Sequence, residues 1–192
     1  MKIAVDAHGG DHAPGEVLKG CAAALERQED LELIVAGDGK TAEEALAELG
    51  ADFNRVTILH TTQVVDMAEP PVAAIKTKKD SSLVRALRAV AEGEADAFVS
   101  AGNTGAVLAG ATMIVRRIEG VKRPALAPLI PTAKGTPVML IYCGANVECR
   151  PEHLAQFGLI GSIYMSRVLG VEAPRVGLIN NGAEPEKGSA LT

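Results

Sequence analysis

The 192-residue chain contains no tryptophan, and only 3% of its residues are aromatic. So few aromatic rings leave little material for stacking nucleic-acid bases or for anchoring a protein at a membrane interface. The charge distribution also argues against nucleic-acid binding, because the formal net charge is −5 and no block of basic residues could follow a phosphate backbone. We therefore expect no nucleic-acid partner.

Cysteines and long hydrophobic runs are also scarce. The cysteines, Cys21, Cys143 and Cys149, are odd in number and too widely spaced for a CxxC pair, which argues against a disulfide framework or a structural zinc site. The longest uncharged stretch, 97–115, has a polar Gly-Asn-Thr-Gly centre that hydrocarbon would leave unpaired. The first residues, MKIAVDA, look like a strand and not a signal peptide. We expect a cytoplasmic protein with buried, reduced thiols.

Short apolar runs alternate with amphipathic segments along the chain. The runs expected to be strands are Lys2 to Val5, Leu31 to Ala36, Val56 to Leu59, Ala97 to Ser100, Pro137 to Ile141 and Val176 to Ile179. Continuous apolar runs are typical of strands that are covered on both faces. The order predicts an α/β fold with three αβα layers, in which helices cover a mostly parallel, doubly wound sheet.

Three segments between or beyond these runs have helical periodicity. They are residues 17–25, residues 83–90, and a segment that opens with Pro151, places Leu154, Phe157, Gly161, Tyr164 and Val168 on one stripe, and closes at Gly170. No repeat or flexible linker divides the sequence. The last residues include Ser189 and Thr192, either of which would suit the start of a further helix. We expect residues 1–192 to be the N-terminal part of one α/β domain, with its C-terminal part missing.

Glycine and asparagine follow four of the expected strands. These turns lie at residues 6–14, 101–106, 144–146 and 180–182. Ligands of open α/β sheets bind beyond the carboxyl ends of the strands, where free backbone N–H groups suit an oxyanion or phosphate. The alternative for each turn alone is that Gly and Asn are common turn formers.

Two helix starts are the sharpest candidates for anion binding. The turn Asn103-Thr104-Gly105 opens a helix without an acidic residue in its first turn, so a ligand oxygen could meet the exposed N–H groups. The alternative is simple capping by Asn103 or Thr104. Lys78 and Lys79 precede a helix that begins near Leu83, where a bound anion would offset their repulsion by the helix dipole. A solvated lysine pair is the alternative.

His8 and His12 raise the question of a metal site. A loop interrupted by Gly9 and Gly10 would not hold two imidazoles at a fixed spacing, so we expect no metal. No histidine is placed beside Cys143 within its own motif, and a thiol nucleophile is unsupported.

Five motifs occur in order along the whole chain. They are DAHGGDHAP at 6–14, KKDSS at 78–82, SAGNTGA at 100–106, CGANVECRPEHLAQFG at 143–158 and GLINNGAEPEKG at 177–188. Together they resemble the bacterial phosphate acyltransferases of phospholipid synthesis, the PlsX type. The resemblance implies transfer of a long-chain acyl group from acyl carrier protein to inorganic phosphate, which gives acyl phosphate for phosphatidic acid synthesis.

The resemblance also carries expectations about architecture. It implies a homodimer without a cofactor, and a fold related to phosphotransacetylases and isopropylmalate-type dehydrogenases. It further implies a chain that continues beyond residue 192, with peripheral contact to the inner face of the membrane through that missing part.

For this reaction the residue chemistry suggests specific roles. We expect Asp11, Asn103 and Thr104 to be catalytic, with Asp11 as a general acid or base. The residues expected to bind phosphate or orient substrate are Gly9, Gly10, Lys79, Ser82, Gly105, Asn146, Asn180 and Asn181. Phosphate is already anionic, so positioning and oxyanion stabilisation can supply most of the rate.

Two residues depart from the pattern of the resembled family. His8 stands where that family usually has Met, and Tyr142 stands where it usually has Asp, which predicts lower turnover because a carboxylate is lost at a strand end. Two other functions stay open. One is an acetyl- or butyryl-type phosphotransacetylase that uses CoA thioesters. The other is a non-catalytic α/β module that binds phosphate or a carrier protein.

Overall fold

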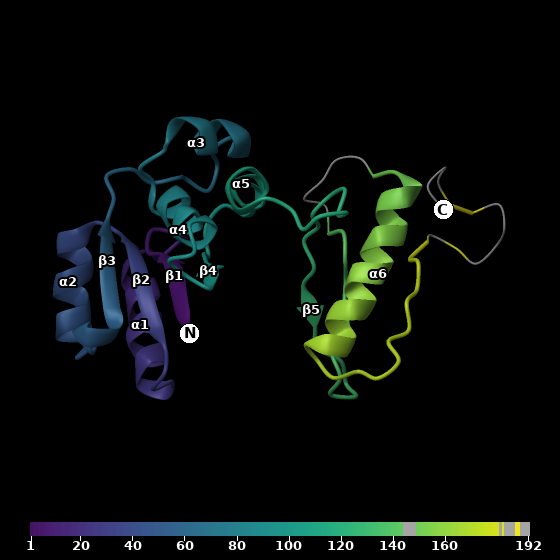
Figure 1. Ribbon diagram of the computed structural model, residues 1–192, viewed down its shortest axis with the longest axis horizontal. Helices are drawn as coiled ribbons and strands as arrows, with labels where there is room; N and C mark the ends of the chain where they lie inside the picture. Colours follow the sequence, from purple (N-terminus) through teal and green to yellow (C-terminus); the bar gives the residue numbers. More distant parts are fainter. Residues whose placement is uncertain (144–148, 181, 183–186, 189–192) are drawn as a thin grey trace. The chain divides into compact units, whose positions relative to one another are not determined.

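A four-stranded parallel sheet organises the first part of the chain. The computed structural model describes residues 1–143, 149–180, 182 and 187–188, and the chain divides into two compact units, Met1–Arg116 and Arg117–Thr192. The strands of the first unit are β1 (Lys2–Asp6), β2 (Glu32–Gly37), β3 (Val56–His60) and β4 (Ala97–Val99), in the order β3-β2-β1-β4 (Figure 1). All four were predicted, and their parallel pairing is confirmed.

Helices cover both faces of this sheet. On one face, α1 (Gly15–Arg27) and α2 (Gly39–Glu48) pack against the sheet, and on the other face α4 (Ser82–Ala91) contacts β1 and β2. The first interface buries Leu18, Leu25, Val35 and Leu46, and the second buries Ala4, Ile34, Ala36, Ala86 and Ala89. The predicted αβα layering and the helical segments 17–25 and 83–90 are therefore confirmed.

Side-chain caps fix where two of these helices begin. The Ser81 hydroxyl accepts a hydrogen bond from the Val84 backbone N–H at the start of α4. The Asp38 carboxylate accepts from the N–H and the hydroxyl of Thr41 at the start of α2. Such caps satisfy backbone donors that have no partner within the helix.

The strand order creates a switch point between β1 and β4. The chain runs from β1 to β2 and β3 on one side, through η1 (Phe53–Arg55), and then crosses to place β4 on the other side of β1. Between β3 and β4 it forms α3 (Pro71–Thr77) before α4, and after β4 it forms α5 (Thr104–Gly110) and the π-helical turn η2 (Ala111–Val115). In open α/β sheets, ligands bind where the strand order reverses in this way.

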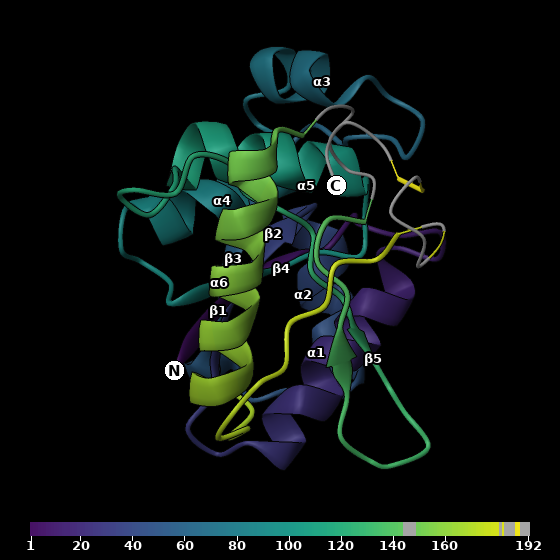
Figure 2. The same ribbon diagram turned by 90° about the vertical axis from the view of Figure 1, so that its right-hand side faces the viewer.

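The second unit contains the antiparallel strands β5 (Leu129–Ile130) and β6 (Val138–Met139) and the helix α6 (Pro151–Arg167). Helix α6 begins at Pro151 as predicted, and Gly170 follows its end with φ +68°. The chain then runs back alongside α6 (Figure 2). A Cβ atom built on Gly158 would lie 3.2 Å from Val176 Cγ1. None of the described helices is long and apolar enough to cross a membrane.

The predicted apolar stripe of α6 is buried along only part of its length. Phe157 is buried, but Tyr164 and Val168 are exposed among the described residues. Periodicity identified the helix, whereas burial also requires a neighbour along the whole stripe.

Two strand predictions are wrong. Residues 137–141 contribute only the two-residue strand β6, which pairs antiparallel with β5, and residues 176–179 form no ladder. Leu178 and Ile179 are exposed. Apolar, β-branched residues favour strand formation, but a ladder also requires an adjacent strand to accept its hydrogen bonds.

Candidate functional site

The loops that follow β1 and β4 touch each other at the switch point. A Cβ atom built on Gly9 would lie 2.8 Å from the backbone N of Gly102 and 2.6 Å from Ser100 Oγ, which leaves no room for a side chain. Gly10 has φ +117° and packs against Ala101. The structure thus brings the expected residues Gly9 and Gly10 against the turn that opens α5.

A buried carboxylate lies beneath this contact. Asp6, the last residue of β1, is 3% exposed, and it accepts hydrogen bonds on both carboxylate oxygens. Ser82 Oγ donates to Oδ1 at 2.5 Å, and Ser100 Oγ donates to Oδ2 at 2.7 Å. Ser82 was expected to bind phosphate. In this structure its hydroxyl hydrogen is directed to Asp6 instead.

Asp6 was missed as a site residue at the sequence level. Its signal was an aspartate that ends an apolar strand immediately before a glycine-rich loop, a place where a carboxylate is costly to bury without partners. The partners come from Ser82 and Ser100, which are distant in the sequence, so the pattern alone could not identify them.

Asn103 uses its whole side chain inside the protein. Its Oδ1 accepts from the Ala106 N–H at 3.0 Å, which caps α5. Its Nδ2 donates toward three carbonyl oxygens of the loop before α3, those of Asp66, Met67 and Glu69. Asn103 thus ties this loop to the start of α5, and its amide is occupied by these contacts.

Thr104 and Gly105 offer the donors that remain at this turn. The Thr104 side chain is exposed and has no hydrogen bond to any described residue. The N–H groups of both residues belong to the first helical turn, where the backbone provides no acceptor. Gly105 has little room for a side chain, since a Cβ there would lie 2.6 Å from Pro71 Cγ.

The two lysines before α4 have local partners. Lys79 Nζ donates to the carbonyl oxygen of Ile75 at 3.1 Å, near the end of α3. Lys78 pairs with Glu69 at 2.7 Å, and this hydrogen bond holds the pKa of Glu69 below its usual value. Cations favour helix C-termini, so the end of α3 accounts for the placement of Lys79, whereas Lys78 is held by Glu69.

Asp80 joins the loop after β3 to the start of α4. A hydrogen bond from the Thr62 hydroxyl, at 2.7 Å, is the main cause that lowers the pKa of Asp80. The Thr62 N–H and the Arg85 guanidinium add to this effect. The charged carboxylate therefore stabilises this junction.

The structure describes two of the four remaining expected residues. Asp11 is exposed in the loop after β1. Asn180 belongs to the second unit, where its Nδ2 donates to the carbonyl oxygen of Lys187 at 3.0 Å. Asn146 and Asn181 lie outside the described residues.

The residues that depart from the resembled family both have structural partners. His8 Nε2 accepts a hydrogen bond from a backbone N–H at the start of α2. The Tyr142 ring stacks on Phe157 of α6, with ring centroids 5.9 Å apart. Within the described ranges, no three His, Cys, Asp or Glu side chains are grouped to hold a metal ion.

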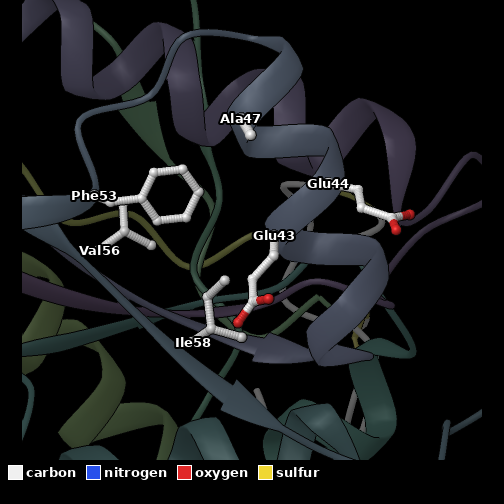
Figure 3. Close-up of a pocket in the computed structure, with 6 residues that line it drawn as sticks. All are labelled: Glu43, Glu44, Ala47, Phe53, Val56 and Ile58. Carbon is white, nitrogen blue, oxygen red and sulfur yellow. The ribbon is translucent and has the colours of Figure 1, made fainter.

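A pocket of about 520 Å³ lies elsewhere, between α2 and the edge strand β3. Figure 3 shows that the Glu43 carboxylate points toward Ile58, beside Phe53 and Val56. Glu44 adds a second negative charge to this shallow surface. An anionic ligand is therefore disfavoured in this pocket.

Comparison with known proteins gives consistent matches. The family model described as "Fatty acid synthesis protein" matches residues 1–192. Proteins named phosphate acyltransferase from Bacillus licheniformis and Bacillus subtilis are 49% and 47% identical to the chain and are aligned with all of it. The chain spans only 57% of the length of each.

Solved structures support the fold. A phosphotransacetylase from Streptococcus pyogenes superposes with a TM-score of 0.65 over 89% of this chain and 55% of its own, at 18% identity. The EutD phosphotransacetylase from Staphylococcus aureus gives 0.61 over 97% of this chain and 59% of its own, at 19% identity. At such low identity these similarities establish the architecture alone.

Proposed function

The chain belongs to the fatty acid synthesis protein family, and from this membership we propose that it acts in the transfer of a long-chain acyl group from acyl carrier protein to inorganic phosphate. The product is an acyl phosphate. The observation that carries the proposal is the match to phosphate acyltransferases along the whole chain.

The proposed reaction exchanges one acyl bond for another. A phosphate oxygen attacks the thioester carbonyl carbon, and a tetrahedral oxyanion forms. The carbon–sulfur bond then breaks, the thiolate leaves with the electron pair, and a proton from the acid–base group or solvent restores the thiol. This chemistry depends mainly on placing phosphate against the thioester and on donors for the oxyanion.

The switch point between β1 and β4 supplies suitable donors. We propose that the Thr104 hydroxyl and the N–H groups of Thr104 and Gly105 contact phosphate or the oxyanion, with Lys79 adding positive charge. Thr104 is exposed and uncommitted among the described residues. Lys79 holds only a carbonyl contact, which it could exchange for an anion.

We also propose roles for residues of the loop after β1 and of the last two motifs. Asp11 is exposed beside the glycine pair, which suits a proposed general acid or base. For Asn146, Asn180 and Asn181 we propose substrate orientation. We further propose a homodimer at the inner face of the membrane, in the cytoplasm, on the basis of the family resemblance.

Product formation tests the reaction directly. Purified protein is incubated with inorganic phosphate and either acyl carrier protein or CoA carrying the same long acyl chain, and acyl phosphate is trapped as its hydroxamate. Product from the carrier-protein thioester alone supports the proposal. Product from the CoA thioester alone favours the phosphotransacetylase alternative, and phosphate binding without product favours the binding module.

Calorimetry with inorganic phosphate tests the site. Thr104→Ala and Lys79→Ala each remove one proposed contact and are expected to weaken phosphate binding about tenfold. Lys76→Ala is the matched control, because Lys76 is an exposed lysine of α3 and has no proposed role. Unchanged affinity in both site variants would move the site elsewhere.

A further inference from the structure

We propose that Asp6 is a positioning residue that orients the turn after β4 through Ser100 and the backbone N–H of Gly102. The inference rests on the proposed function, since that turn is the proposed phosphate contact. It assigns a role to a buried carboxylate that contacts no substrate itself.

The direction of the hydrogen bonds is fixed by chemistry. The Gly102 N–H donates to Ser100 Oγ at 3.0 Å, and Ser100 Oγ lies 2.7 Å from Asp6 Oδ2. An ionised carboxylate only accepts, so the single hydroxyl hydrogen of Ser100 must point to Asp6. Ser100 therefore presents its lone pairs to Gly102, one residue before Asn103 caps α5.

The second carboxylate oxygen anchors Asp6 from other elements. Ser82 Oγ, at the first residue of α4, donates to Oδ1 at 2.5 Å, and the His8 N–H donates to the same oxygen at 3.3 Å. A carboxylate bonded on both sides has little freedom to rotate. Asp6 thus links α4, the first loop and the turn after β4 at one buried point.

Burial separates this role from direct binding. Asp6 is 3% exposed, and Gly9 lies over it, because a Cβ on Gly9 would sit 2.8 Å from Asp6 Oδ2. A carboxylate in contact with phosphate would also repel it. The effect of Asp6 on phosphate must therefore pass through the groups that it holds.

Two substitutions break the connection at different atoms. Ser100→Ala removes the acceptor of the Gly102 N–H and leaves Asp6 in place. Asp6→Asn keeps the size but offers only one acceptor oxygen, so one of the two serine hydroxyls can no longer donate to residue 6. Ser81→Ala is the matched control, because it deletes a fully buried hydroxyl that caps α4 and does not touch Asp6.

The experiment measures inorganic phosphate affinity by calorimetry and the exchange rate of the Gly102 amide by NMR, under conditions where every variant is folded. We expect Ser100→Ala and Asp6→Asn to weaken phosphate binding about tenfold and to speed Gly102 exchange about tenfold. We expect Ser81→Ala to lower thermal stability while both readouts stay within about twofold of wild type.

The outcomes separate the inference from the proposed function. Wild-type phosphate affinity and Gly102 exchange in Ser100→Ala overturn the inference, even if Asp6→Asn fails to fold. Equal loss in Ser81→Ala also overturns it, because the effect is then general destabilisation. If the wild-type protein binds no phosphate, the proposed function fails, and the Gly102 exchange rate alone decides whether Asp6 holds the turn.

Discussion

His8 Nε2 accepts a hydrogen bond from the backbone N–H of Asp38 at 3.1 Å. At the same helix start, His60 Nδ1 accepts from the Gly39 N–H at 2.9 Å. Two imidazoles, from the loop after β1 and the end of β3, therefore satisfy the first amides of α2. Each acceptor nitrogen is unprotonated, so the ring hydrogen sits on His8 Nδ1 and on His60 Nε2.

Replacing His8 with Met, the residue usual in the resembled family, removes the acceptor for the Asp38 N–H. A thioether accepts hydrogen bonds only weakly, so we expect the free energy of unfolding to fall by about 0.5–1.5 kcal/mol. Urea unfolding at neutral pH measures the change. His12→Met is the matched control, since His12 is exposed, and an equal loss in both variants would contradict the role of the His8 contact.

Gly9→Ala forces a Cβ atom into the contact between the two loops. The new atom would meet Ser100 Oγ, Asp6 Oδ2 and the Gly102 backbone N, all within 2.8 Å. Because one neighbour is backbone, we expect a loss of about 1–3 kcal/mol in unfolding free energy. Gly20→Ala, inside α1 and without neighbours near its Cβ, should instead stabilise by about 0.5–1 kcal/mol. Equal effects would show that the contact does not restrict residue 9.

Asp80→Asn should make thermal stability less sensitive to acid. Hydrogen bonding from Thr62 lowers the pKa of Asp80, so this carboxylate adds stability above its unfolded pKa of about 3.9. That stability is lost as the pH falls through the lower pKa of the folded state. Thermal unfolding of the wild type and of Asp80→Asn between pH 7 and pH 3 should show a difference in Tm that becomes smaller as the pH falls. A difference in Tm that is the same at every pH would exclude ionisation of Asp80 as its cause.

Cys21 should resist alkylation in the folded protein. Burial raises the pKa of its thiol to about 11, so the reactive thiolate is scarce at pH 8. In a Cys143→Ser/Cys149→Ser background, we expect iodoacetamide to label Cys21 only after unfolding. The raised pKa also predicts stability that is complete below about pH 8.5 and declines as the pH rises toward 11. Rapid labelling of the native protein would contradict this.

Tyr142→Asp restores the carboxylate that is usual in the resembled family, and we expect a higher kcat for acyl transfer. The same change removes the stacking on Phe157, which should lower the unfolding free energy by about 0.5–1.5 kcal/mol. Tyr142→Phe keeps the stacked ring and adds no carboxylate, so it should not raise kcat. If Tyr142→Asp leaves kcat unchanged, a carboxylate at this position does not contribute to turnover.

The sheet of the first unit could be predicted because its strands and their covering helices are local patterns. Val56 to Leu59 and Ala97 to Ser100 show the apolar runs of strands covered on both faces, and the structure places both in the sheet. The helix start at Asn103 could also be predicted, because a capping residue and the backbone N–H that it binds, here that of Ala106, lie three positions apart.

The candidate site was less predictable because its contacts join distant segments. The sequence did not distinguish Lys78 from Lys79, whereas in the structure Lys78 pairs with Glu69 and Lys79 contacts the end of α3, a helix that was not predicted. The sequence around Ser82 shows no partner for its hydroxyl, because the partner, Asp6, lies 76 residues away. Residues 176–179 had the composition of a strand, but composition does not provide the neighbour that a strand must pair with.

The spacing of the Asp6 partners has a consequence for synthesis on the ribosome. Asp6 emerges with β1, but Ser82 and Ser100 lie 76 and 94 residues later. At about 5–20 residues per second, translation leaves the carboxylate without these partners for roughly 5–20 s. During that interval β1, β2 and β3 can already pair, since their contacts are shorter in range. On the ribosome, three strands of the sheet can therefore pair before Asp6 has the serine partners with which it is buried.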